Sequence, residues 1–142
     1  MTDNGIRLAP PSTLSCVLTL IFVRLGLAIR GYVPTRRALE RLSNPIRTAA
    51  QRPVSVSLTI TPAQISARVN AAAIFLPTRA VCLEQSLTLY FLLRRRGLDP
   101  QLQIGVHPFP FAAHAWVELE ASPINEDPAI TRTFRVLSAS RE

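Results

Sequence analysis

The chain has 142 residues, of which 48% are hydrophobic and 18% are charged, which excludes a disordered chain and is typical of one globular domain. All 16 basic residues are arginine, and the net charge of +7 lies in the first half of the chain, where residues 1–71 hold nine arginines and two acids. Such a basic half indicates an acidic peptide, an acidic protein or anionic lipid as partner, or only a solvated surface. No aromatic-basic motif supports binding to nucleic acid.

The two cysteines, Cys16 and Cys82, lie far apart in the sequence. Two cysteines do not make a disulfide framework or a metal site. We also expect no cofactor. Cys16 lies in a hydrophobic run and is predicted to be a small buried residue. A free, reactive Cys82 fits a reducing, cytoplasmic location.

The first predicted helix runs from a cap at Ser12 to about Arg30, and Gly31 ends it. Its apolar stretch, residues 14–29, is shorter than the about 20 residues that span a membrane, and it contains Arg24. We favour a helix that packs on the domain over one that lies on a membrane surface, and a peripheral membrane contact stays open.

A second, short helix is predicted over residues 35–42, with Asn44-Pro45 ending it. Alternating apolar and polar residues over 54–60 then predict a strand or an extended linker. A strong helix start follows in Thr61-Pro62-Ala63-Gln64, which combines a cap, a proline at the first helical position and a capping box. This third helix is expected to run to about Phe75.

The next helix is predicted from residue 78 or 79 to residue 96, and Gly97 ends it. Three strands are predicted after it, over residues 101–107, 114–120 and 134–137. Residues 108–113 are too many for a tight turn, so the first two strands are expected to form a hairpin with a substantial loop, and residues 121–123 a turn. Helices first and strands second predict an α+β fold.

The candidate chemistry begins with Cys82, because the unpaired N–H groups at a helix start stabilise a thiolate. A cysteine in an amphipathic helix is usually a core residue, but His114 at the start of a neighbouring strand supplies a base. Glu126 and Asp127, one strand-turn later, are candidates for the acid that holds the imidazole, and each is alternatively an ordinary turn carboxylate. A helix-borne cysteine, a strand histidine and an acid form the papain-like arrangement.

Three blocks of sequence resemble the lasso peptide leader peptidases, a transglutaminase-like family of papain-related cysteine proteases. They are Cys82-Leu83-Glu84-Gln85-Ser86-Leu87, His114-Ala115-Trp116-Val117-Glu118 and Asn125-Glu126-Asp127. Between the first two blocks, the resemblance also includes Leu92-Leu93-Arg94-Arg95-Arg96-Gly97 and Ile104-Gly105-Val106. The resemblance covers about residues 71–137. It implies a catalytic core over residues 71–142, with a Cys-bearing helix and an antiparallel sheet. Residues 1–70 would then form a basic helical region that packs on this core or binds partners.

The resemblance implies a peptidase that removes the leader from a ribosomally made precursor peptide. Its partners would be that leader, a small leader-recognition protein and an ATP-dependent lasso cyclase. The family's cysteine and histidine carry over to Cys82 and His114. The family's acid is typically an aspartate that follows the asparagine, and this position holds Glu126. We favour Glu126 as the third member of the triad, with Asp127 as the alternative, since a one-residue shift on a strand turns a side chain to the other face.

Two other functions stay open from the sequence. One is a different transglutaminase-like reaction, an acyl or amide transfer, because water and an amine compete for the same acyl-enzyme. The other is a non-catalytic basic module that binds peptides or a membrane surface.

Overall fold

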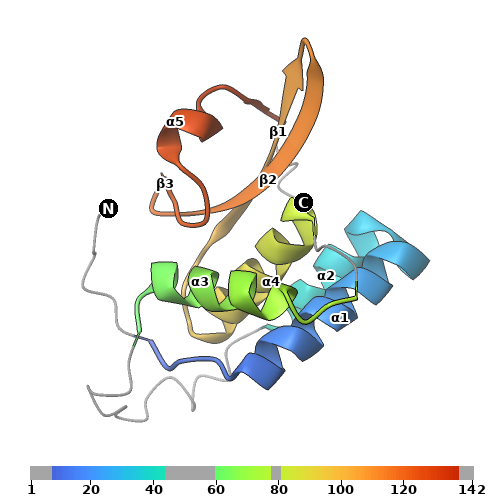
Figure 1. The fold of residues 1–142 in the computed structure, drawn as a ribbon, viewed down its shortest axis with the longest axis vertical. Helices are drawn as coiled ribbons and strands as arrows, with labels where there is room; N and C mark the ends of the chain where they lie inside the picture. Colours follow the sequence, from blue (N-terminus) through green and yellow to red (C-terminus); the bar gives the residue numbers. More distant parts are fainter. Residues whose placement is uncertain (1–7, 44–59, 78–80, 138–142) are drawn as a thin grey trace.

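The computed structural model describes residues 8–43, 60–77 and 81–137 (Figure 1). Helices come first: α1 (Thr13–Arg30), α2 (Tyr32–Leu42), α3 (Pro62–Ala73) and α4 (Cys82–Arg95). The second half holds β1 (Gln101–Pro108), β2 (Phe111–Leu119), β3 (Ser122–Pro123), the short helix α5 (Pro128–Thr131) and β4 (Arg135–Val136). The strands form an antiparallel sheet in the order β3-β2-β1-β4, so the predicted α+β class is confirmed.

The start and the end of α1 are formed as the sequence predicts. The Ser12 hydroxyl accepts a hydrogen bond from the backbone N–H of Ser15 at 3.1 Å. Gly31 ends the helix with a φ of 81°, a conformation that glycine adopts without a steric penalty. Cys16 is fully buried in the hydrophobic core, and this prediction is confirmed.

Helix α2 begins at Tyr32, three residues before its predicted start. The expected boundary followed Pro34, but proline fits the first turn of a helix, where its missing N–H would have no partner. Thr35, one turn in, donates its hydroxyl to the Gly31 carbonyl at 2.7 Å. The helix ends at Leu42 as predicted, whereas the Asn44-Pro45 stop lies outside the described residues.

Helix α3 begins with the predicted capping box. Thr61 accepts from the Gln64 backbone N–H at 3.3 Å, and the Gln64 side chain accepts from the Thr61 N–H at 2.8 Å. The helix ends at Ala73, slightly before the predicted Phe75. Most of the strand predicted just before it lies outside the described residues; its last residue, Ile60, forms an antiparallel bridge with Leu8.

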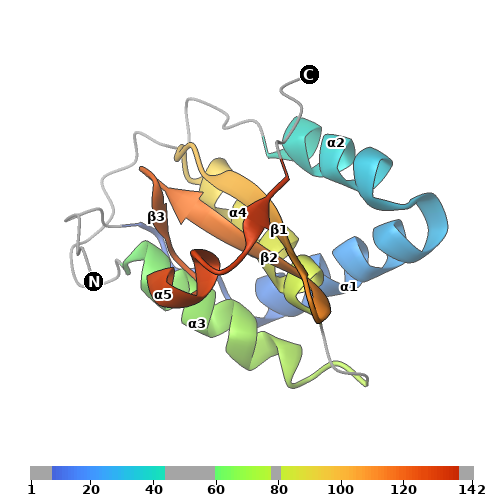
Figure 2. The ribbon, with the colours of Figure 1, turned by 90° about the horizontal axis from the view of Figure 1, so that it is seen from above.

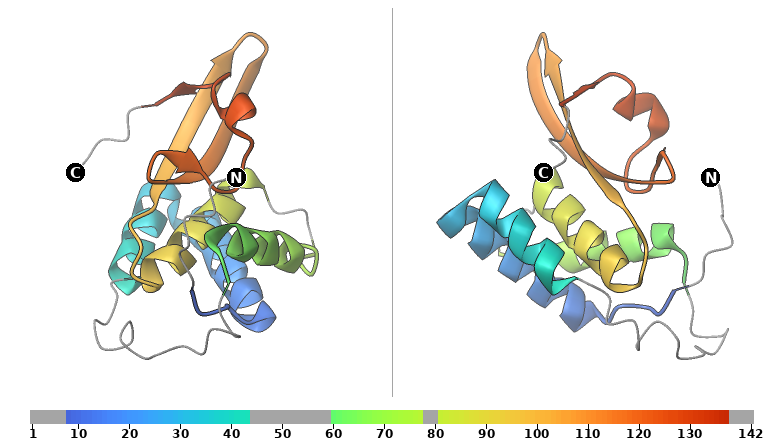
Figure 3. Two further views of the ribbon diagram at one scale, coloured as in Figure 1. Left: turned by 90° about the vertical axis from the view of Figure 1, so that its left-hand side faces the viewer. Right: turned by 180° about the vertical axis from the view of Figure 1, so that it is seen from behind.

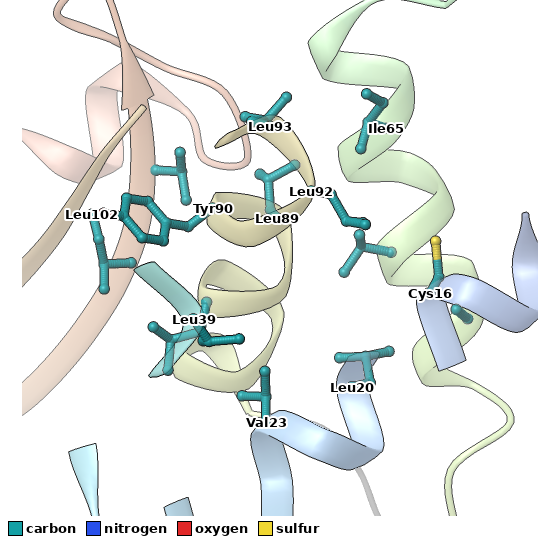
Figure 4. Close-up of a cluster of buried hydrophobic side chains, with 14 of the residues drawn as sticks. Cys16, Leu20, Val23, Leu39, Ile65, Leu89, Tyr90, Leu92, Leu93 and Leu102 are labelled. Carbon is teal, nitrogen blue, oxygen red and sulfur yellow. The ribbon is translucent and has the colours of Figure 1, made fainter. Parts of the chain in front are cut away.

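Helix α4 lies at the centre of the molecule, in contact with the other three long helices and with β1 and β2 (Figures 2 and 3). One hydrophobic cluster joins these elements, and part of it is drawn in Figure 4. Its members come from both halves of the chain and include Cys16, Leu20, Val23, Leu39, Ile65, Leu89, Leu92, Leu93 and Leu102. Contacts with all of these elements therefore fix α4, and with it the position of Cys82.

The hairpin of β1 and β2 is tighter than predicted. The strands pair from Gln101 opposite Glu118 to Pro108 opposite Phe111, so only two residues form the turn. The expectation of a long loop over residues 108–113 is wrong. β4 pairs with β1 only at Gly105 and Val106, so Pro108 lies past that pairing, where its missing N–H interrupts no ladder on that side.

The remaining connections differ in detail from the prediction. Glu120 and Ala121 have positive φ angles of 51° and 65° and make the turn, so the turn lies one residue earlier than predicted and leads into β3. The last strand, β4, holds two residues within the predicted span of residues 134–137. Leu137 extends this pairing by donating its backbone N–H to the Ile104 carbonyl at 2.8 Å.

Helix α1 is apolar on two sides. Cys16, Leu20 and Val23 face the core, so the predicted packing is confirmed for this side. The other side exposes Leu14, Leu18, Ile21, Phe22, Leu25 and Ile29. By length and composition alone α1 could cross a membrane, and only 17% of it is buried within the protein.

Candidate active site

Cys82 is the first residue of α4, and its side chain is partly buried. The residue before it, Val81, occupies the cap position without a side-chain hydrogen bond, because valine has no polar atom to offer. The first-turn N–H groups of α4 are therefore not capped by this side chain. Unpaired N–H groups at a helix start are a favourable setting for a negative charge, and Cys82 occupies this first turn.

His114 and Glu126 are joined by a short hydrogen bond. His114 Nε2–H donates to Glu126 Oε2 at 2.6 Å, and both side chains are about one fifth exposed, at 23% and 21%. The other carboxylate oxygen, Oε1, accepts from the Asp127 backbone N–H at 2.9 Å. With Nε2 held by the carboxylate, Nδ1 is the nitrogen of His114 that remains to exchange a proton with a thiol.

Asp127 has a different partner. Its side chain caps α5, where Asp127 Oδ1 accepts from the Ala129 backbone N–H at 2.8 Å, and it is exposed. The expectation that Glu126 and Asp127 alternate along a strand is wrong, because the chain leaves β3 after Pro123 and bends into α5.

Helix α4 and strand β2 are connected close to both Cys82 and His114. Ser86, one helical turn after Cys82, is fully buried and donates its hydroxyl to the carbonyl of Ala115 at 3.0 Å. Residues four apart lie on the same face of a helix, so the face that bears Cys82 is turned toward the part of β2 that holds His114. Among the described residues no hydrogen bond joins the thiol to the imidazole; catalytic hydrogen bonds often tighten only when substrate binds.

An aromatic cluster covers the imidazole. The His114 ring stacks on Trp116 with centroids 6.0 Å apart, and Phe134 lies 5.6 Å from His114 and 6.2 Å from Trp116. Trp116 is buried, and its indole N–H donates to Glu118 Oε1 at 3.0 Å. The sequence draws attention to Trp116 but not to Phe134, which reaches His114 only because β4 pairs beside β1.

Gly105 makes room for this cluster. It lies opposite His114 in the β1–β2 register, and a Cβ atom there would come within 2.6 Å of Phe134 Cβ and 2.8 Å of Trp116 Cη2. The aromatic side chains occupy the space above the glycine, so this strand position excludes any larger residue.

His107, the other histidine, contacts the hairpin turn and an aromatic ring. Its Nδ1 lies 3.2 Å from the Pro110 carbonyl in the hairpin turn, and its ring packs edge-on against Phe134 at 6.2 Å. Within the described ranges, no three His, Cys, Asp or Glu side chains gather in a way that could hold a metal ion.

An α+β fold with a cysteine at a helix start, and with a histidine bound to a carboxylate on the adjoining sheet, has the architecture of the papain-related cysteine enzymes. The chain belongs to the transglutaminase-like superfamily, whose family model matches residues 17–139.

The chain is also similar to the microcin J25-processing protein McjB of Escherichia coli, with 37% identity over 57 residues. The alignment covers 40% of this chain and 27% of McjB, so the chain spans about a quarter of the length of that relative. No solved structure matches the chain.

Proposed function

We propose that the protein is a cysteine peptidase that removes the leader from a ribosomally made lasso precursor peptide. Cys82 is the nucleophile, His114 the general base and acid, and Glu126 the carboxylate that orients His114. The observation that carries this proposal is the 2.6 Å bond between His114 on β2 and Glu126 on the bend that follows β3. The hydrogen bond from Ser86 to Ala115 joins the first turns of the Cys82 helix to the same strand. Membership of the transglutaminase-like superfamily and the similarity to McjB support it.

In the acylation step, His114 Nδ1 takes the proton of the Cys82 thiol, and the thiolate attacks the carbonyl carbon of the last leader residue. The oxyanion is stabilised by the backbone N–H of Cys82 at the start of α4. His114 then gives the proton to the leaving nitrogen, and the C–N bond breaks. The core peptide departs with a new amino terminus, and the leader remains as a thioester on Cys82.

In the second step, water attacks the thioester while His114 Nδ1 accepts its proton. The C–S bond breaks, the leader leaves as a carboxylic acid, and the thiol is restored by the proton on His114. Glu126 keeps its bond to Nε2 throughout and stabilises the imidazolium form. The reaction needs no metal and no cofactor.

The proposed partners are the precursor leader, a leader-recognition protein and a lasso cyclase, in the cytoplasm. The basic first half supports engagement of an acidic partner, since Arg37 and Arg41 are exposed on α2. Arg36 is held within the fold by Glu40 and Tyr32, so it contributes less to such a surface. Replacing Arg37 and Arg41 by glutamine is expected to weaken binding of the partner most at low salt.

The test is cleavage of a lasso precursor peptide, with the recognition protein present, followed by mass spectrometry. Cys82→Ala is expected to abolish cleavage with the fold intact, whereas the matched control Cys16→Ala keeps activity near normal. A product that carries an added amine on the leader would instead indicate an acyl transferase. Cleavage that survives in Cys82→Ala and is lost in Cys16→Ala would overturn the assignment.

A further inference from the structure

Three hydrogen bonds connect the three segments that hold the candidate triad. Ser86 Oγ–H donates to the Ala115 carbonyl at 3.0 Å. Asn125 Nδ2–H donates to Ser86 Oγ at 3.0 Å, and Asn125 Oδ1 accepts from the Val117 backbone N–H at 2.8 Å. The first segment is α4, the second is β2, and the third is the bend between β3 and α5.

The geometry of the sheet explains why these bonds form. The Val117 carbonyl accepts from the Ile124 N–H at 2.8 Å, so the polar groups of Val117 face the β3 side of the sheet. In an antiparallel pair, residues two apart face the same neighbour, so the carbonyl of Ala115 also points to the β3 side. The strand β3 holds only two residues and does not reach Ala115. Ser86 satisfies this carbonyl instead.

The Asn125 side chain takes the place of a backbone carbonyl in the ladder. Because its amide oxygen satisfies the Val117 N–H, the backbone at residue 125 is free to turn away from β2. That turn brings the next residue, Glu126, back over the sheet to His114. The orientation of the amide is unambiguous, since a backbone N–H can only donate and must face Oδ1.

Three members of this network lie close in the sequence to one candidate catalytic residue each. Ser86 lies one turn after Cys82, Ala115 follows His114, and Asn125 precedes Glu126. Ser86 is fully buried and uses its hydroxyl as both donor and acceptor. Among the described residues, the Ser86 hydroxyl has two hydrogen-bond partners. One is the Ala115 carbonyl on the strand of His114, and the other is the Asn125 amide on the bend that holds Glu126.

We propose that Ser86 and Asn125 are positioning residues that align Cys82, His114 and Glu126, an inference that rests on the proposed function. Among the described residues, their side chains bond to each other and to the backbone of Ala115 and Val117, so they act through the segments that they hold. Their hydrogen bonds set the separation between the start of α4 and the imidazole, and they hold the bend that delivers the carboxylate. Misplacement of such groups by about 1 Å can lower a rate about 100-fold.

Thr88 provides a matched control. It is fully buried on the same helix, and its hydroxyl donates at 2.8 Å to the Glu84 carbonyl within that helix. Ser86→Ala and Thr88→Val each remove one buried hydroxyl with little change in volume. The second change leaves the connection between the helix, the strand and the bend intact.

The first readout does not depend on any peptide. The chain contains two histidines, so NMR of protein labelled with ¹⁵N-histidine resolves the His114 ring, with His107→Gln for assignment. The Nε2–H signal of His114 is expected to exchange slowly with water in the wild type. It is expected to exchange faster or disappear in Ser86→Ala and Asn125→Ala, as in Glu126→Gln, and to persist in Thr88→Val. Asn125 is only partly buried, so its variant serves if Ser86→Ala does not fold.

The second readout is leader cleavage, where kcat is expected to fall about 10- to 100-fold in Ser86→Ala and Asn125→Ala with KM nearly unchanged. A His114 signal that stays protected in both variants, with Tm lowered only as far as in Thr88→Val, would reduce the network to a structural role and overturn the proposal. If the wild type cleaves no leader but the signal responds as described, the proposed function fails and the positioning role stands.

Discussion

Arg24 of α1 forms an ion pair with Glu84 of α4, and Glu84 lies two residues after Cys82. Its Nη2 lies 3.0 Å from Glu84 Oε2, and its Nε lies 3.3 Å from both carboxylate oxygens. Glu84 is 12% exposed and lies in the first turn of α4, where a negative charge is favoured by the helix dipole. This ion pair connects the basic first half of the chain directly to the start of the helix that bears the candidate nucleophile.

Replacing Arg24 by glutamine should therefore destabilise the fold. The carboxylate of Glu84 would lose its charged partner while staying mostly buried, and we expect the free energy of unfolding to fall by about 1–3 kcal/mol. Urea unfolding measures it. The exposed Arg30, at the end of the same helix, is the control, and its glutamine variant should change stability by less than about 0.5 kcal/mol. Equal effects of the two substitutions would show that the ion pair does not stabilise the fold.

The two neighbouring acids should respond very differently to loss of charge. Glu126→Gln weakens the bond that orients His114, so we expect kcat for leader cleavage to fall by several orders of magnitude with substrate binding little changed. Asp127→Asn should have almost no effect, because asparagine caps a helix as well as aspartate does. Steady-state kinetics of both variants measure the difference.

The reverse ranking would transfer the orienting role to Asp127 and require the bend before α5 to rearrange. Small and equal effects would leave Cys82 and His114 as a dyad. Asp127→Ala separates capping from catalysis, since it should lower Tm through the loss of the α5 cap while activity per folded molecule is retained.

The capping box and the Gly31 stop were predictable because their signals lie within a few residues of each other. Cys82 and His114 were predictable as candidates for a related reason: a helix start and an alternating strand leave local patterns. Residue-level roles in catalysis stay predictions, as does the division of the chain at residue 70.

What the sequence could not predict depends on pairing between distant segments. The two-residue hairpin turn is set by the register of β1 on β2, and prolines beside it suggested a loop. Phe134 reaches His114 through the position of β4 in the sheet, and Ser86 meets Asn125 across 39 residues. No sequence pattern within a single segment predicts such contacts between distant segments.

The stability of the protein should fall at alkaline pH in a way that depends on Cys16. Burial raises the pKa of the Cys16 thiol above its ordinary value of 9.0, so the folded protein holds this proton longer than the unfolded chain. The contribution is fully present below about pH 9 and is lost as pH rises toward the folded pKa. Unfolding measured from pH 8 to 10.5 should show a shallower decline for Cys16→Ala than for the wild type.

Titration of Tyr90 does not affect the comparison between the wild type and Cys16→Ala. Burial raises its pKa as well, but the residue is present in both proteins, so its contribution cancels in the difference between the two curves. Parallel curves for the wild type and Cys16→Ala would contradict the prediction.

Adding one methyl group at Gly105 should disturb the aromatic cluster over His114. The new Cβ would lie within 2.6 Å of Phe134 Cβ, close to backbone that cannot move freely. We expect Gly105→Ala to lower the free energy of unfolding by about 1–3 kcal/mol and to shift the emission of Trp116, the only tryptophan, to longer wavelength. Ala113→Ser on the exposed part of β2 is the control, and an unchanged spectrum in Gly105→Ala would argue against the tight packing.

The connection between Ser86 and Asn125 has a consequence for a chain that is still being made. During synthesis, Cys82 and its helix leave the ribosome before the strand of His114, and the bend with Asn125 and Glu126 follows both. Asn125 lies 39 residues after Ser86, and until this bend has emerged His114 lacks its bond to Glu126 and Ser86 of the helix lacks its bond to Asn125. A nascent chain that has not yet released this bend therefore lacks the contacts that would align the proposed triad of Cys82, His114 and Glu126.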